Sequence, residues 1–485
     1  MDKQLAIIFK IMGMLMVGFS FTFLIPVGIS FLYSDGQAHY FISAFISTIV
    51  LGILLWLPFR NVTYELKTRH GFIIVALFWS VLSLIGAVPL YLSKELDISF
   101  VHAFFEATSG FTTTGATVLN HLETLPKSIL WYRTQLHFFG GMGIIILAVA
   151  IMPILGMGGM ALFKAEVPGP MKEEKLTPRI AQTARNLWFV YISLMLACIV
   201  SYYIAGMDLF DAITHGFSTV ATAGFANYDD SIGYFQSELI NWIAIFFMFM
   251  GGINFTLHFL VFREKSVKRY FQNFELRTFF FVSVGASIIV AITLHYFSIF
   301  NGWYDSIVNG FFTVMAMITT TGFLINPFSD WPIFLPLLLI FLSFMGACAG
   351  STTGGMKMIR IILVCKQAYS EVKHLIHPRA ELPVRVDGKV IPLSILASVW
   401  AFIVLYGLST AVLTLVMIGC GLTPLDAFSA GAGCLNITGP ALGSIANNYS
   451  SISDTGLSVL SFTMLLGRLE IFTIFVLLTP SFWRS

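Results

Sequence analysis

Four short segments of this sequence share small or hydroxyl-bearing residues and end in glycine. They are Thr112-Thr113-Thr114-Gly115, Ala221-Thr222-Ala223-Gly224, Thr319-Thr320-Thr321-Gly322 and Asn436-Ile437-Thr438-Gly439. None of these four tetrads contains Asp, Glu, Cys or His, which argues against a charged-ring filter and against a transition-metal site. Backbone carbonyls remain as ligands, with a threonine hydroxyl at the inner end. Because glycine allows successive carbonyls to face one side, the tetrads suit a large, weakly hydrated monovalent cation.

Each tetrad follows an apolar segment of about ten residues and precedes a long hydrophobic run. Such a segment is too short to cross a bilayer, but it can enter and return as a short helix. Non-helical backbone at that depth survives only where it is buried in protein or lines a watery cavity. Asp211, Asp305 and Asp426 are predicted to be N-caps of these short helices, where a carboxylate complements the helix dipole. Each helix then directs its partial negative C-terminus at a common centre.

The tetrads belong to a larger unit, which consists of a span, a short re-entrant helix, a tetrad and a second span. A glycine-containing echo follows each tetrad: Phe139-Gly140-Gly141-Met142-Gly143, Met250-Gly251-Gly252-Ile253-Asn254, Gly346, and Leu466-Gly467-Arg468-Leu469-Glu470. Every unit starts and ends on the same side of the membrane. The repeats are therefore parallel, and an axis along the membrane normal relates them.

The expected fold is an all-α polytopic membrane protein with four parallel M1–P–M2 repeats around a pseudo-fourfold pore. About ten transmembrane helices and four re-entrant pore helices are expected. The predicted divisions are residues 1–70 for an N-terminal transmembrane hairpin, 71–156 for repeat 1, 157–262 for a cytoplasmic linker and repeat 2, 263–364 for repeat 3 with an intramembrane Gly-rich loop at 346–355, and 365–485 for a cytoplasmic linker and repeat 4.

The composition is that of a membrane protein. The chain has 485 residues, of which 57% are hydrophobic and 11% are charged, with a mean hydropathy of +0.85. Soluble domains carry about 25% charged residues. The five cysteines lack metal-ligand or disulfide spacing and are interpreted as buried hydrophobes. No Walker motif, dinucleotide fingerprint or nucleophile elbow is present, so the sequence does not predict an enzyme.

The positions of the basic residues predict the orientation in the membrane. Most Lys and Arg fall in the two termini and in segments around Arg60–Arg69, Lys164–Arg185, Arg263–Arg277 and Lys357–Lys389. By the positive-inside rule these segments and both termini are cytoplasmic. Lys94, Lys127 and Arg133 are assigned to the alternate, outer loops, where the tetrads also emerge.

Two features within the predicted spans could form a gate. The second span of repeat 3 is interrupted by small residues that make poor helix, among them Gly346, Gly350, Ser351, Thr352, Thr353, Gly354 and Gly355. One interpretation is a loop that obstructs the pore beneath the tetrads; the alternative is close helix packing through Gly346, Gly350 and Gly354. Arg468 lies inside the last span, where a cation should face a cavity or a partner. It is predicted either to project into the pore and bond the loop, or to hold carbonyls together structurally.

These residues resemble the Trk/Ktr/HKT superfamily of potassium transporters, and most closely the membrane subunits of bacterial Trk potassium uptake systems. The resemblance rests on four T-x-G-type loops in one chain and on the extra N-terminal hairpin, and it covers nearly the whole sequence. It implies that Thr113–Gly115, Thr222–Gly224, Thr320–Gly322 and Ile437–Gly439 supply filter carbonyls, and that residues 346–355 form a gating loop. Ile437 and Pro440 depart from the other copies, so tight potassium over sodium selectivity is not expected and rubidium is expected to pass.

The resemblance also implies a bacterial inner-membrane location, a homodimer with one pore per chain, and a cytosolic nucleotide-binding regulatory subunit, TrkA. The basic segments 157–185, 263–277 and 357–389 are its expected platform, although they could equally contact anionic lipid. Potassium is expected as the transported ion, with no organic cofactor. The function predicted is channel-like potassium uptake; the alternative is a sodium- or proton-coupled symporter, which a carboxylate in the transport path would favour.

Overall fold

The structure, a computed structural model, describes residues 3–62, 68–143, 180–332 and 334–484. Its regular structure is almost entirely helical, which confirms the all-α class; within those ranges the strands are β1 (Arg385–Val386) and β2 (Lys389–Val390), an antiparallel pair. Six of the described helices are long and apolar enough to cross a membrane, and two sharply bent helix pairs meet the same criterion together. The expected total of about ten spans stays a prediction.

Four successive parts of the chain each combine a long helix, a short helix that ends in a tetrad, and a further helix. The parts are α4 (Thr68–Leu92), α5 (Phe100–Phe111) and α6 (Lys127–Gly141); α9 (Ile180–Ile204), α10 (Leu209–Val220), α11 (Glu238–Gly251) and α12 (Phe255–Glu264); α14 (Phe274–Tyr296), α15 (Trp303–Ile318), α16 (Phe334–Met345) and α17 (Met358–Ile376); and α18 (Leu393–Gly419), α19 (Pro424–Leu435), α20 (Asp454–Arg468) and α21 (Phe472–Leu478). The third helix of each part packs on the short helix of the next, as α6 on α10, α11 on α15, α16 on α19 and α20 on α5. This order closes the four parts into a ring.

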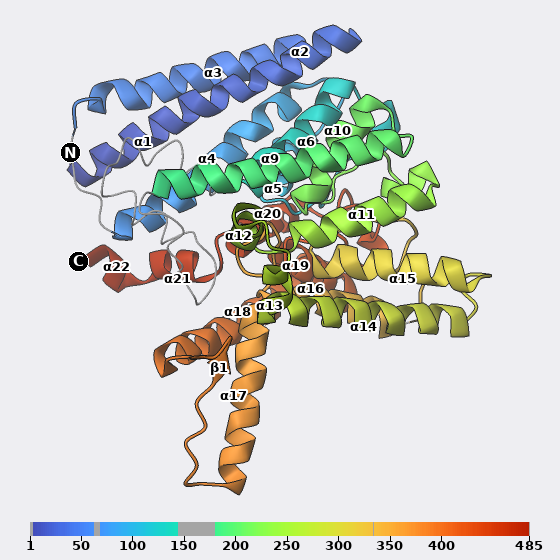
Figure 1. Cartoon of the computed structure of the whole chain (residues 1–485). Coiled ribbons are helices and arrows are strands. Elements are labelled where there is room, and N and C mark those ends of the chain that lie inside the picture. The colour runs from blue at the N-terminus through green and yellow to red at the C-terminus, as the bar shows by residue number, and fades with distance from the viewer. Residues whose placement is uncertain (1–2, 63–67, 144–179, 333, 485) are drawn as a thin grey trace.

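The N-terminal hairpin lies along one side of this ring (Figure 1). It consists of α1 (Lys3–Ser20), η1 (Phe21–Phe23), α2 (Leu24–Tyr33) and α3 (Ala38–Trp56), and it packs on α4 and α6. The predicted turn is present, with Ser34 and Gly36 in the left-handed region. Burial alone would raise the pKa of the Asp35 carboxyl, but hydrogen bonds from Ser30 and from the backbone of Ser128 hold that pKa below its ordinary value.

The starts of the short helices differ from the prediction. The N-caps are Ser99, Asp208 and Thr423, each of which accepts a hydrogen bond from the backbone N–H three residues later, and α15 begins after Gly302 without a side-chain cap. The prediction that Asp211, Asp305 and Asp426 are the caps was therefore wrong. All three lie in the first turn, where a carboxylate still complements the helix dipole.

The glycines that follow each tetrad allow a close approach of helices. A Cβ on Gly140 or Gly467 would collide with the carbonyl oxygen of Phe111 or Leu435, at the end of the short helix in the same part. The chain also bends near these glycines, by 93° between α11 and α12 and by 111° between α20 and α21. The sequence predicted an interruption only in the third part; the structure adds breaks in the second and fourth.

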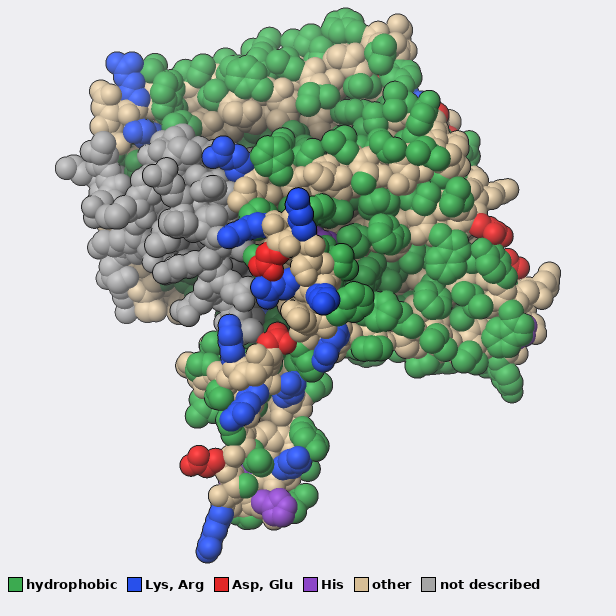
Figure 2. All heavy atoms as spheres, in the orientation of Figure 1, with side chains coloured by type: hydrophobic (Ala, Val, Ile, Leu, Met, Phe, Trp, Pro, Cys, Tyr) green, Lys and Arg blue, Asp and Glu red, His purple; other side chains and the backbone are tan. Residues whose placement is uncertain are grey.

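An arm projects from the ring on the side of the chain termini. Its core is α17, which runs across the direction of the neighbouring α14 and away from the rest of the molecule (Figure 1). Lys and Arg side chains gather along this arm and the adjoining surface, with a few Asp and Glu among them, and further Asp and Glu appear at the opposite end (Figure 2). The remaining short elements are η2 (Leu57–Phe59), η3 (Leu122–Thr124), η5 (Ser231–Phe235), α13 (Lys268–Gln272), η6 (Gly443–Ile445) and α22 (Pro480–Arg484).

The orientation drawn from the basic segments stays a prediction. Lys67, the predicted boundary at residues 156–157 and the basic residues from Lys164 to Arg179 lie outside the described residues. Arg133 does not lie in an outer loop as predicted, because it is part of α6 and only 1% exposed.

Candidate ion-conduction site

The four tetrads share one backbone conformation. The second residue and the glycine of each have positive φ: +61° and +79° at Thr113 and Gly115, +51° and +93° at Thr222 and Gly224, +52° and +74° at Thr320 and Gly322, and +52° and +93° at Ile437 and Gly439. In every copy the amide of the first residue bonds the carbonyl four residues earlier, and the amide of the third bonds the carbonyl five earlier. A β-branched residue in the left-handed region is strained, and such strain is held where surrounding structure fixes it, often at ligand sites.

The tetrads meet edge to edge in a closed ring, here called the filter ring. A Cβ on Gly115 would collide with the carbonyl oxygen of Ala223, and the same relation joins Gly224 to Thr321 and Gly322 to Thr438. The ring closes where a Cβ on Gly439 would lie 2.5 Å from the carbonyl oxygen of Thr114. Only glycine fits at these four junctions, because the next segment occupies the place of a side chain.

Most carbonyl oxygens in the last three residues of the tetrads accept no hydrogen bond. Among the described residues, no donor reaches the carbonyl of the last three residues of any tetrad, with one exception: the Tyr449 hydroxyl donates to Gly439 O at 2.6 Å. The non-glycine residues at these positions are at most 2% exposed. Buried carbonyls normally have a partner, and an unpaired polar group costs about 1–3 kcal/mol. A dehydrated cation at the centre would satisfy them, and the C-termini of α5, α10, α15 and α19 add their negative dipole ends.

The predicted interruption of the third span is present, because no helix crosses residues 346–357. Gly346, Gly350 and Gly355 have positive φ, so the glycine spacing serves a loop rather than a helix-packing face. The first half of this intramembrane loop is bound to the second part of the ring: Cys348 N donates to Gly252 O at 3.0 Å, and Phe255 N donates to Gly350 O at 3.0 Å.

The intramembrane loop lies against the first or second residue of three tetrads. Thr352 Oγ1 is 3.0 Å from Thr222 Oγ1, and Gly354 N donates to Thr320 Oγ1 at 2.7 Å. Gly355 N donates to the carbonyl oxygen of Asn436 at 3.2 Å. A Cβ on Gly354 would collide with Asn436 O and with the side chain of Ile437, so the backbone there is in direct contact with the fourth tetrad.

Arg468 covers the remaining tetrad from the end of α20. Its Nη1 donates to Thr113 Oγ1 at 3.1 Å and to Thr352 O at 3.2 Å, and its Nη2 donates to Gly140 O at 2.5 Å. Its guanidinium also lies 5.1 Å from the centre of the Trp79 ring. The arginine therefore joins the loop to the first tetrad and also holds carbonyls, which agrees with both interpretations of its role.

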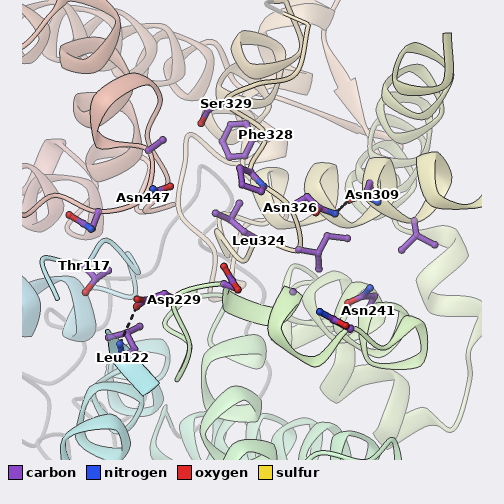
Figure 3. Close-up of a pocket in the computed structure, with 18 of the residues that line it drawn as sticks. Thr117, Leu122, Asp229, Asn241, Asn309, Leu324, Asn326, Phe328, Ser329 and Asn447 are labelled. Carbon is purple, nitrogen blue, oxygen red and sulfur yellow. Dashed lines mark hydrogen bonds between the residues drawn. The ribbon is translucent and has the colours of Figure 1, made fainter. Parts of the chain in front are cut away.

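A cavity of about 760 Å³ opens next to the segments that follow the tetrads (Figure 3). All four parts line it, through Thr117, Asp229, Asn326, Asn447 and their neighbours. Its described lining contains Asp229, Asp230, Glu238 and Asp305 but no Lys or Arg. A cleft of one sign of charge concentrates counter-ions, so this cavity favours the approach of cations.

Comparison with known proteins identifies the family of this chain. The family model TrkH, described as a cation transport protein, matches residues 37–485. The chain belongs to the TrkH family. It is 46% identical over 484 residues to the Trk system potassium uptake protein TrkH of Vibrio parahaemolyticus, covering 99% of this chain and 100% of that relative. The protein of the same name from Escherichia coli K12 is 44% identical over 98% of this chain and 99% of its own length. The crystal structure of the potassium transporter TrkH from Vibrio parahaemolyticus superimposes with a TM-score of 0.91 at 44% identity, covering 99% of this chain and 100% of that one.

The TrkH family is one of transport proteins rather than enzymes, as the sequence predicted. Membership also accounts for the expected multi-pass membrane class. Among the described residues, no group of three or more His, Cys, Asp or Glu could hold a metal ion.

Sequence reasoning missed three interactions of buried charges. Arg133 pairs with Glu106 at 2.7 Å. Arg360 pairs with Glu470 at 2.6 Å. Lys357, assigned to a cytoplasmic segment, is buried and its ammonium donates to the carbonyl of Thr353 in the intramembrane loop. Glu106 and Glu470 each stand in an apolar run of the sequence. An isolated charge in such a run is costly, and this cost is the signal that could have indicated a basic partner for each.

Proposed function

We propose that this chain conducts potassium across the bacterial inner membrane through the filter ring. The observation that carries the proposal is the ring of carbonyl oxygens of the last three residues of each tetrad, which, Gly439 apart, have no donor among the described residues. The printed names of the relatives, which are potassium uptake proteins, favour potassium as the ion. Carbonyl ligands replace the hydration shell of such a cation as it passes. The proposed architecture is four M1–P–M2 repeats around one pore, with both termini in the cytoplasm.

The proposed gate is the intramembrane loop together with Arg468. Loop and arginine contact all four tetrads at the ends from which the short helices approach, and no other described segment does so. In this arrangement they occupy the path beneath the filter ring, and the guanidinium adds a positive charge that repels cations. In this proposal the pore is closed in the present arrangement, and opening requires the loop to leave the tetrads.

Control from the cytosol is proposed to act through a nucleotide-binding subunit of the TrkA kind. The arm built on α17 begins directly after the intramembrane loop, so a force on the arm reaches the gate through a few residues. Exposed basic side chains on the arm offer the regulatory subunit a charged surface (Figure 2). The same proposal includes a homodimer with one pore in each chain.

The test is rubidium uptake into liposomes that contain the purified chain. Uptake down its gradient, without a sodium or proton gradient, is expected for the channel; a requirement for either gradient would favour the coupled symporter. Gly224→Ala should abolish uptake, because its Cβ would collide with Thr321 O. Gly285→Ala is the matched control, since a Cβ there meets nothing within 4 Å. If Gly224→Ala is folded and transports as well as the control, the ring is not the pathway.

A further inference from the structure

An ion pair is completely buried behind the first tetrad. Glu106 on α5 and Arg133 on α6 are 0% and 1% exposed, and Arg133 Nε lies 2.7 Å from Glu106 Oε1. Removing two charges from solvent costs several kcal/mol per ion, which the attraction repays only when further hydrogen bonds satisfy both groups. The further hydrogen bonds of this pair connect it to the segments that follow the first two tetrads.

Glu106 binds the chain segment that leaves the first tetrad. The Thr117 hydroxyl lies 2.9 and 3.0 Å from the two carboxylate oxygens, and the amide of Val118 donates to Oε2 at 3.0 Å. Arg133 Nη2 adds a 3.2 Å bond to Thr117 Oγ1. Since Thr117 is the second residue after Gly115, these contacts fix the outer exit of the first tetrad to its own helices.

Arg133 extends the network to the neighbouring repeat. Its Nη1 donates to the carbonyl oxygen of Ala226 at 3.2 Å, and its guanidinium lies 4.2 Å from the centre of the Phe225 ring. Ala226 is the second residue after Gly224, just as Thr117 is after Gly115. One guanidinium therefore joins the outer exits of two adjacent tetrads at matching positions.

The other repeats lack this pair. Counted back from the tetrad glycine, the positions that match Glu106 hold His215, Thr313 and Ala430; counted back from the next glycine echo, those that match Arg133 hold Ala244, Leu339 and Leu460. In the fourth repeat a neutral contact takes its place, in which Leu442 N donates to Ser429 Oγ at 3.0 Å. Among the described residues, the positions that match Glu106 and Arg133 thus form no ion pair at the other three junctions, although the buried carboxylate of Asp211 accepts a hydrogen bond from Asn227 Nδ2 in the second repeat.

We infer that Glu106 and Arg133 are positioning residues that set the width of the filter ring between its first two tetrads, and thereby its discrimination of potassium from sodium. This inference rests on the proposed conduction of potassium through the ring. Arginine is required, because its planar fork presents donors to Glu106, Thr117 and Ala226 at once, which a lysine ammonium cannot do. If the junction between the first two tetrads loosens, the carbonyls can move inward and coordinate the smaller sodium ion, or leave room for the water molecules that hydrate it.

The test compares Arg133→Lys with wild type for rubidium uptake and for its inhibition by sodium and potassium. Lysine keeps the charge pair but cannot hold the Ala226 carbonyl together with Glu106. We expect uptake to continue and the ratio of the sodium to the potassium inhibition constant to fall about tenfold. Thr117→Val, which removes the hydroxyl but keeps the ion pair, should shift the ratio in the same direction by a smaller factor.

Ile11→Ala, a cavity in the N-terminal hairpin, controls for lost stability because Ile11 is 0% exposed and belongs to the core of α1, away from the ring. It should lower the melting temperature without changing the ratio. An unchanged ratio in both Arg133→Lys and Thr117→Val would overturn the inference, as would an equal change in Ile11→Ala. Absence of rubidium uptake in the wild type would instead contradict the proposed function.

Discussion

Gly354→Ala provides a steric test of the proposed gate. Gly354 is buried where the intramembrane loop touches the fourth tetrad, and a Cβ there would collide with Asn436 O and the side chain of Ile437. Its φ is not positive, so alanine itself is not strained at this position. The collision can be relieved only by moving the loop away from the tetrad or by deforming the filter ring.

Moving the loop breaks two hydrogen bonds, from Gly354 N to Thr320 Oγ1 and from Gly355 N to Asn436 O. At about 0.5–1.5 kcal/mol each, their loss weakens docking of the loop by about 1–3 kcal/mol. This corresponds to a shift of about 5–150-fold in the equilibrium between docked and released loop. We therefore expect rubidium flux into liposomes to rise about fivefold or more.

Gly407→Ala is the control for this experiment, because a Cβ on Gly407 meets nothing within 4 Å. It should leave flux and melting temperature near the wild-type values. A monodisperse Gly354→Ala protein with unchanged or reduced flux would refute the reasoning. It would mean that the loop is not the obstruction, or that the ring yields before the loop does.

Three further predictions concern other contacts. Arg468→Ala removes a charge from the inner end of the ring, so rubidium flux should rise; unchanged or lower flux in folded protein would favour a purely structural arginine. Tyr449→Phe releases the carbonyl of Gly439, which should change the potassium to sodium inhibition ratio severalfold without lowering the amount of folded protein. The lowered pKa of Asp35 contributes stability above the ordinary carboxyl pKa, and this contribution is lost as the pH falls below about 4. The melting temperature of Asp35→Asn should therefore respond less to a change from pH 7 to about pH 3 than that of the wild type.

The repeats and the positions of the tetrads could be predicted from the sequence because four copies in register carry the same backbone requirement. The glycine junctions and the strained second residues follow one pattern, and any single copy would have been uninformative. The loop of repeat 3 was also predictable, since its residues are poor helix formers. Its glycine spacing left helix packing open, and positive φ at Gly346 and Gly350 decided in favour of the loop.

Apart from the bond between Arg468 and the intramembrane loop, contacts between distant segments were not predicted. Asp211 and Asp426 were assigned as caps because carboxylates favour that position, yet Asp208 and Thr423 cap equally well and stand one turn earlier. Arg133 was assigned to an outer loop, but it lies on α6, and the carboxylate that pairs with it lies on another helix. Such pairs depend on how helices pack, which spacing along the chain does not encode.

Closure of the filter ring within one polypeptide has a consequence for its evolution. In an assembly of four identical subunits, one codon change alters every quadrant of the conduction path simultaneously. Here a codon change alters a single quadrant, so each quarter can diverge while the other three preserve coordination. Ile437 illustrates this freedom, because it stands where the other copies have threonine and removes one hydroxyl instead of four. A single chain thus turns one symmetric requirement into four that can mutate separately.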